Sequence, residues 1–155
     1  MLYVGIDVAS EKHDCCILDQ KKNVLSSFSF ANSQKGFDLF LNSVSQFDTP
    51  ENTWVGLEAT GIYGTNLTYF LRRNGIQVTT LNPLLLKNNR KGTTLRKTKT
   101  DKTDAKHIAS FLMQEAPQPD LPASYHISEL KSLTRLRFHT VKDRSTAKVK
   151  AQGIL

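Results

Sequence analysis

Residues 3–30 read YVGIDVASEKHDCCILDQKKNVLSSFSF, and this segment predicts three β-strands. Residues 3–8 form an apolar run with one acid, whereas residues 13–19 and 24–30 alternate between two faces. Residues 20–23 are typical of a hairpin turn. Because short connections join antiparallel strands, we expect the chain to open with an antiparallel meander.

Helices and strands alternate in the rest of the first two thirds of the chain. We expect a helix capped by Asn32 or Ser33, strand 53–58, a helix that ends at Asn74-Gly75, strand 76–81 and helix 101–115. Right-handed crossovers would join the later strands in parallel, next to the antiparallel hairpin. This order predicts an α/β fold of the ribonuclease-H-like class, a mixed five-stranded sheet flanked by helices.

Proline residues mark the end of this domain. We expect a domain over 1–116, a rigid proline-rich linker over 117–126 and a basic helix over 127–155. The basic helix has a thin apolar seam that includes Leu130, Leu133 and Leu136. Such a helix usually packs on another helix, so it predicts a coiled-coil arm and a homo-oligomer, or the cut end of a longer protein.

The net charge of +7 is concentrated in the second half of the chain. Two dense basic segments, 87–106 and 131–150, favour binding to a polyanion over a merely solvated surface. Residues 87–99 are predicted to form a mobile loop that leads into Asp101. The residues expected to contact nucleic acid are Lys87, Arg90, Lys91, Arg96, Lys97, Lys99, Lys102, Arg135, Arg137, Lys142 and Arg144.

Several other classes of protein fit the sequence poorly. No apolar run approaches the roughly 20 residues that span a bilayer, and the first residues lack a secretory leader, so we expect a cytoplasmic protein. Cys15 and Cys16 are neighbours in a strand and would point to opposite faces. They are expected to pack in the interior, with no disulfide or zinc role.

Two acids follow glycines on the strands expected to be neighbours. Asp7 stands two residues after Gly5, and Glu58 stands two residues after Gly56. The glycines are expected to leave the sheet surface open beneath the two acids. Because adjacent buried carboxylates repel each other, a divalent cation is a natural partner.

Asp101 and Asp104 are spaced to lie on one side of the last helix of the domain. That side continues through Ala105 and Ile108, the expected core-facing positions, whereas His107 is expected at the surface. Four carboxylates, Asp7, Glu58, Asp101 and Asp104, would then meet at one edge of the sheet. Oxygen ligands favour Mg²⁺ or Mn²⁺, and two such ions suit phosphodiester chemistry. Each acid could instead have a purely structural role. Asp101 could be a helix N-cap, with Asp104 favoured by the helix dipole in the first turn. Asp7 could be a turn residue at the strand end and Glu58 a loop residue.

Specific motifs resemble the N-terminal domain of the DEDD-type insertion-sequence transposases, which include Piv-like invertases and bridge-RNA-guided recombinases. The matching segments are Val4-Gly5-Ile6-Asp7-Val8, Glu58-Ala59-Thr60-Gly61-Ile62-Tyr63 and Lys99-Thr100-Asp101-Lys102-Thr103-Asp104-Ala105. The resemblance implies a RuvC-like fold, metal ligands Asp7, Glu58, Asp101 and Asp104, and metal-dependent DNA strand cleavage and exchange during transposition.

The same resemblance implies partners outside this sequence. In the family a second, C-terminal domain supplies a nucleophilic serine, and a guide RNA directs the bridge recombinases. We therefore expect a chain that stops before its second catalytic domain and cuts DNA poorly alone. The alternatives are a non-catalytic nucleic-acid-binding module, a stand-alone Holliday-junction resolvase, and a sugar-kinase-like phosphotransferase, which would need about twice this length.

Overall fold

The computed structural model describes residues 1–58, 63–93, 101–120 and 125–152, and all their side chains except those of 90–93, 101–103, 125–129, 131 and 132. The chain divides into two units, Met1–Asp120 and Leu121–Leu155. The boundary falls inside the linker predicted over 117–126. Asp120 belongs to the first unit because its backbone N–H donates to Val78 O at 3.0 Å and its carboxylate accepts from Thr80 N–H at 2.8 Å.

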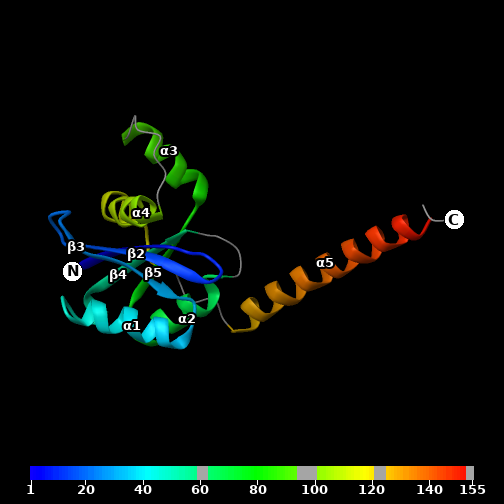
Figure 1. Cartoon of the computed structure of the whole chain (residues 1–155), viewed down its shortest axis with the longest axis horizontal. Helices are drawn as coiled ribbons and strands as arrows, with labels where there is room; N and C mark the ends of the chain where they lie inside the picture. The colour runs from blue at the N-terminus through cyan, green and yellow to red at the C-terminus, as the bar shows by residue number, and fades with distance from the viewer. Residues whose placement is uncertain (59–62, 94–100, 121–124, 153–155) are drawn as a thin grey trace. The chain divides into compact units, whose positions relative to one another are not determined.

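A mixed five-stranded sheet forms the centre of the first unit (Figure 1). Its strands are β1 (Leu2–Asp7), β2 (Lys12–Leu18), β3 (Val24–Ala31), β4 (Thr53–Glu58) and β5 (Gln77–Leu81), in the order β3-β2-β1-β4-β5. β1, β2 and β3 pair antiparallel, whereas β1 pairs with β4 and β4 with β5 in parallel. The predicted meander, the mixed sheet and the contact between the first and fourth strands are confirmed.

Two helices, α1 (Gln34–Ser45) and α2 (Thr65–Arg73), cover one face of the sheet (Figure 1). Ser33 caps α1, as predicted, by accepting the Gly36 N–H at 3.3 Å. Gly75, with φ of +79°, follows α2 in a left-handed conformation that suits glycine. Phe40, Val44, Leu67 and Leu71 from these helices pack on the apolar face of β1 and β4 and form the larger core.

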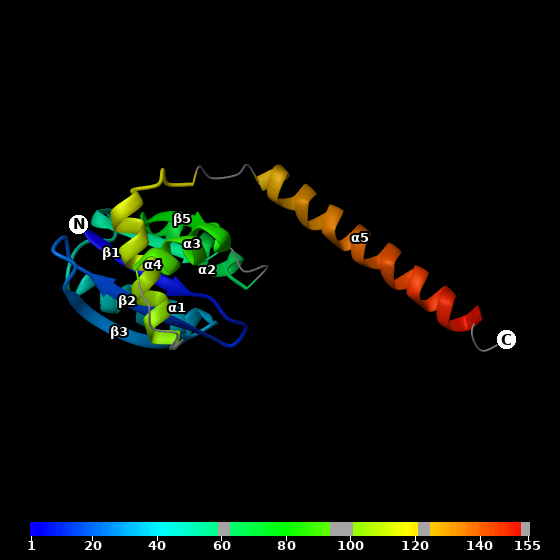
Figure 2. The same cartoon turned by 90° about the horizontal axis from the view of Figure 1, so that it is seen from above.

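The other face is covered by α4 (Asp101–Glu115), which lies across β1 and β2 (Figure 2). Its buried side chains include Ala105, Ile108 and Leu112, the positions predicted to face the core. A Cβ added at Gly5 would lie 2.1 Å from Ala105 O. The expectation that the glycines leave an open sheet surface is therefore wrong at Gly5, because the helix backbone occupies that space.

A helix also replaces part of the predicted mobile loop. α3 (Pro83–Thr93) includes Lys87, Arg90 and Lys91. Asn82-Pro83 ends β5, as expected, but it also starts this helix. Asn82 Oδ1 accepts the Leu84 N–H at 2.9 Å, and proline is favoured in the first turn of a helix. The loop prediction is wrong for residues 87–93, and residues 94–100 lie outside the described residues.

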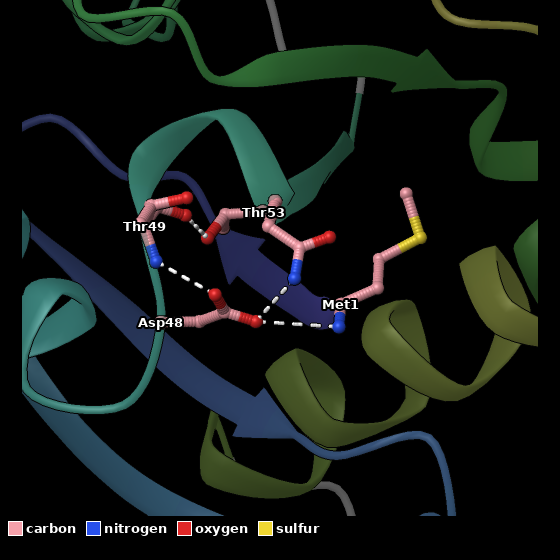
Figure 3. Close-up of polar contacts among 5 residues, drawn as sticks. Met1, Asp48, Thr49 and Thr53 are labelled. Atoms are coloured by element: carbon pink, nitrogen blue, oxygen red, sulfur yellow. Dashed lines mark hydrogen bonds and ion pairs between the residues drawn. The ribbon is translucent and has the colours of Figure 1, made fainter.

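Polar contacts hold the amino ends of β1 and β4 together (Figure 3). The carboxylate of Asp48 lies 3.3 Å from the Met1 ammonium and accepts the Thr49 N–H at 2.8 Å. Thr53, whose hydroxyl donates to Thr49 O at 2.9 Å, pairs with Leu2 at the start of the parallel ladder. This network lies at the opposite end of β1 and β4 from Asp7 and Glu58, and it supports the register that aligns them.

The two cysteines are free and buried, as predicted. Cys15 packs in the core beneath α1 and α2, whereas Cys16 packs with Ala105 and Ala109 of α4. Burial raises the pKa of both thiols and so disfavours the thiolate that binds metals.

The second unit contains α5 (Tyr125–Gln152). Its described apolar side chains, among them Leu133, Leu136 and Phe138, are exposed. Across the described parts of the chain, no helix has the length and apolar character needed to cross a membrane.

Candidate metal centre

Asp7 and Glu58 end adjacent parallel strands. Ile6 pairs with Leu57, so the next residues along the two strands are Asp7 and Glu58. Gly5 and Gly56, two positions earlier, face α4. Because side chains alternate along a strand, both carboxylates lie on the α4 side of the sheet. Both residues are half-buried.

A pocket joins Glu58 to the amino-terminal part of α4. It has a volume of about 360 Å³ and is lined by Glu58, Pro83, Leu86, Lys87, Asp104, His107 and Ile108. Two of the predicted acids, Glu58 and Asp104, therefore line one pocket although they are distant in sequence. Asp7 lies on β1, the strand that pairs with the strand of Glu58. Lys87 introduces a positive charge into the same pocket.

The fourth predicted acid, Asp101, begins α4, but its side chain lies outside the described residues. Within the described set, no three His, Cys, Asp or Glu side chains lie close enough together to hold a metal ion. Convergence of the four carboxylates on one cation therefore stays a prediction.

His107 does not lie where the sequence suggested. It is half-buried and lines the pocket with Glu58 and Asp104, so its expected surface position is wrong. The reason is helical geometry, since residues three apart share one side of a helix. The spacing from Asp104 to His107 is the same as the spacing from Asp101 to Asp104, and this signal was available in the sequence.

A further carboxylate next to the site was not predicted. Asp14 of β2 is the register partner of Asp7 and in turn pairs with Ser29 of β3. Its exposed fraction is only 8%, and the Ser29 hydroxyl donates a hydrogen bond to its Oδ1. Asp7, Asp14 and Ser29 thus form a row across the sheet on the α4 side. The short connection between the first two strands could have revealed this pairing.

The predicted nucleic-acid contacts are distributed over both units. In the first unit, Lys87 is exposed at the pocket. In the second unit, Arg135, Arg137, Lys142 and Arg144 are exposed on α5. The backbone of three further predicted contacts lies in helices, but their side chains are outside the described residues: Arg90, Lys91 and Lys102. The last three predicted contacts lie wholly outside the described residues: Arg96, Lys97 and Lys99.

Sequence comparison decides the family. A model of the IS110-type DEDD transposase family, described as "Transposase", matches residues 4–155, nearly the whole chain. The chain belongs to this transposase family. The resemblance inferred from the sequence motifs is thereby confirmed.

Relatives of the chain include gene-inverting proteins. The pilin gene-inverting proteins of Moraxella lacunata and Moraxella bovis are each 31% identical to it over 138 residues. These matches cover 88% of the chain but 42% of each relative. The chain therefore spans less than half the length of these relatives.

Solved structures confirm the predicted fold. Thermus thermophilus RuvC matches with a TM-score of 0.54 at 14% identity, over 78% of this chain and 100% of RuvC. The same protein in complex with a Holliday junction substrate matches with a TM-score of 0.51 at 16% identity, over 78% of this chain and 99% of that one. The predicted RuvC-like, ribonuclease-H-like fold is confirmed.

Proposed function

We propose that this chain supplies the metal-dependent catalytic domain of a DNA transposase or site-specific recombinase that cleaves and exchanges DNA strands. The observation that carries the proposal is the pocket shared by Glu58 and Asp104, beside the strand that ends in Asp7. Membership of a transposase family and similarity to proteins that invert a pilin gene support DNA as the substrate.

The chemistry of the proposed ligands suits a hard divalent cation. Asp7, Glu58, Asp101 and Asp104 offer carboxylate oxygens, which Mg²⁺ and Mn²⁺ prefer. A pair of such ions would activate the attacking oxygen and stabilise the leaving oxygen of a phosphodiester. Lys87, on the α3 side of the pocket, would bind a DNA phosphate next to these carboxylates.

The nucleophile is not assigned to this chain. In the DEDD transposases it resembles, a second domain contributes a serine, and the chain spans only 42% of its curated relatives. We therefore propose that the domain supplies one half of a composite site. DNA is the proposed partner, and a guide RNA and a second copy of the chain bound through α5 are further proposed partners.

Substitution of the strand-end acids tests the proposal. In the full-length protein, Asp7→Asn and Glu58→Gln should each lower recombination by at least about 100-fold, because loss of an outer-shell partner alone costs about 10–100-fold and each substitution removes a charge that holds the cations. Circular dichroism should show an unchanged fold. The matched control is Asp38→Asn, an exposed acid on α1 at the other face of the sheet.

The alternatives give different results in the same assays. Recombination within a few-fold of wild type in Asp7→Asn or Glu58→Gln would contradict the proposed role. Efficient cutting of four-way junctions by residues 1–155 alone would indicate a stand-alone resolvase. DNA binding that does not respond to Mg²⁺ or Mn²⁺, without any cleavage, would indicate a non-catalytic binding module.

A further inference from the structure

The structure places a buried acid directly opposite one of the proposed metal ligands. Asp14 is the cross-strand partner of Asp7 in the antiparallel β1–β2 pair. Directly opposed residues have Cβ atoms roughly 4.5–5.5 Å apart and point to the same face, and like charges in such a pair destabilise the sheet. A strand pair that carries two acids at this position needs a compensating interaction.

The hydrogen bond described for Asp14 comes from an uncharged group, the Ser29 hydroxyl. The ion pair of Met1 with Asp48 and that of Arg72 with Asp120 do not involve Asp14. The neighbouring His13 packs with Phe30 and Phe37 on the opposite face of the sheet. The hydrogen bond from the Ser29 hydroxyl fixes Oδ1 of Asp14 and leaves Oδ2 available as an acceptor.

We propose that Asp14 is a positioning residue of the metal centre, which accepts hydrogen bonds from water molecules of the hydrated cation held by Asp7. This inference rests on the proposed function. Protein-bound Mg²⁺ usually keeps several waters, and outer-shell acceptors orient the groups that surround a metal. Asp14 acts through these waters and through Asp7, and Ser29 holds it in place.

A purely structural role makes a different prediction. In that case Asp14 would serve only as the acceptor for Ser29 between β2 and β3. Asp14→Asn retains a side-chain oxygen that can accept this hydrogen bond, and it changes the shape of the side chain little. The substitution removes the negative charge, so it separates the positioning role from the structural one.

Calorimetric titration of the purified protein with Mn²⁺ tests the inference. Asp14→Asn should weaken Mn²⁺ binding by about 10-fold or more, the usual effect of losing an outer-shell partner. Ser29→Ala should weaken it by a smaller factor, and Asp7→Asn should abolish it. Asp38→Asn is the matched control and should bind as the wild type does. Without metal, Asp14→Asn should keep or raise Tm, because it removes a carboxylate–carboxylate repulsion.

The results separate this inference from the proposed function. If the wild type binds no Mn²⁺, or Asp7→Asn binds it normally, the proposed function fails and the role of Asp14 fails with it. If Asp7→Asn loses binding while Asp14→Asn binds as the wild type does, only the role of Asp14 is overturned. A metal-free Tm for Asp14→Asn several degrees below wild type would also overturn it, since the inference requires that the opposed carboxylates of Asp7 and Asp14 repel each other when no metal is bound.

Discussion

At the scale of single residues, His13 is a titratable group within the apolar core. Its side chain is fully buried, and its ring lies 5.3 Å from Phe30 and 6.2 Å from Phe37, measured between centroids. Nδ1 accepts the Ala9 N–H at 3.3 Å. Burial lowers the pKa of His13, and this effect exceeds the opposing influence of Asn32 and Asp14. The folded protein therefore favours the neutral imidazole.

This burial predicts a loss of stability in mild acid. An unfolded histidine has a pKa near 6.5, so below that pH the unfolded state binds more protons than the folded state. The stabilisation linked to His13 is complete above about pH 6.5 and is lost as the pH falls through and below that value. The free energy of unfolding, measured by urea denaturation between pH 8 and 5, should fall less in His13→Gln than in wild type.

The exposed His139 of α5 provides the control for that experiment. His139→Gln should show the same pH dependence as the wild type. An identical pH dependence in His13→Gln and wild type would contradict the account of His13.

Other residues show how far the sequence alone could define the candidate site. Asp7 and Glu58 could be placed side by side because each ends a strand and the strand order was predictable. Asp104 followed from helical spacing. Asp14 was missed because its importance depends on register, which a single-residue shift would change. The burial of His13 arises from contacts with β3 and α1, which no local pattern encodes.

At the scale of secondary structure elements, the contact between α4 and β1 depends on Gly5. A Cβ there would meet two backbone atoms, Ala105 O at 2.1 Å and Ala109 N at 2.4 Å. Backbone atoms of a packed helix cannot move aside independently, so a methyl group would displace α4 as a whole. Asp104 lies on α4, and its place in the pocket lined by Glu58 therefore depends on this close approach.

Gly5→Ala should destabilise the protein by about 3 kcal/mol, at the upper end of the usual cost of overpacking. It should also weaken Mn²⁺ binding because it shifts Asp104. At Gly64, the N-cap of α2, an added Cβ would meet only Val8 methyl groups, at 3.6 and 3.7 Å. Gly64→Ala should therefore cost only about 1 kcal/mol or less, the loss of a favoured N-cap residue. Denaturant unfolding measures both values, and equal costs at the two glycines would contradict the packing argument.

The elements differ in how well local sequence predicted them. The bounds of β4 and α4 match the predicted strand 53–58 and helix 101–115. α3 was missed because its basic residues suggested a loop, whereas Leu86 is buried against Leu81, Ile108 and Phe111. That contact with the sheet and α4 is tertiary, and tertiary packing commonly decides whether a helix of modest propensity forms.

At the scale of the whole molecule, basic residues are distributed over both units. Lys87 lies at the pocket of the first unit, and Arg135, Arg137, Lys142 and Arg144 are exposed on α5. Phosphate contacts release counterions, so DNA affinity should fall steeply with salt. The exposed Leu133, Leu136 and Phe138 of α5 fit the prediction of a helix that pairs with another copy, and that pairing stays a prediction.

DNA binding measured over a range of salt concentrations tests the role of α5. Replacing both Arg135 and Arg137 by Ala should reduce the slope of log K against log salt by about two, because each lost phosphate contact changes it by roughly 0.9. Arg73→Ala, on the α2 side of the sheet, is the control and should leave the slope unchanged. If the double variant of Arg135 and Arg137 has the same slope as the wild type, Arg135 and Arg137 do not contact phosphates.

The central claim is that carboxylates from β1, β4 and α4 share a divalent cation. The most direct measurement is a crystal structure of the protein with Mn²⁺, in which anomalous scattering locates the ions. We predict anomalous peaks within coordination distance of Asp7, Glu58 and the Asp101–Asp104 turn. An ordered site without a peak at saturating Mn²⁺, or with peaks only elsewhere in the molecule, would contradict the account.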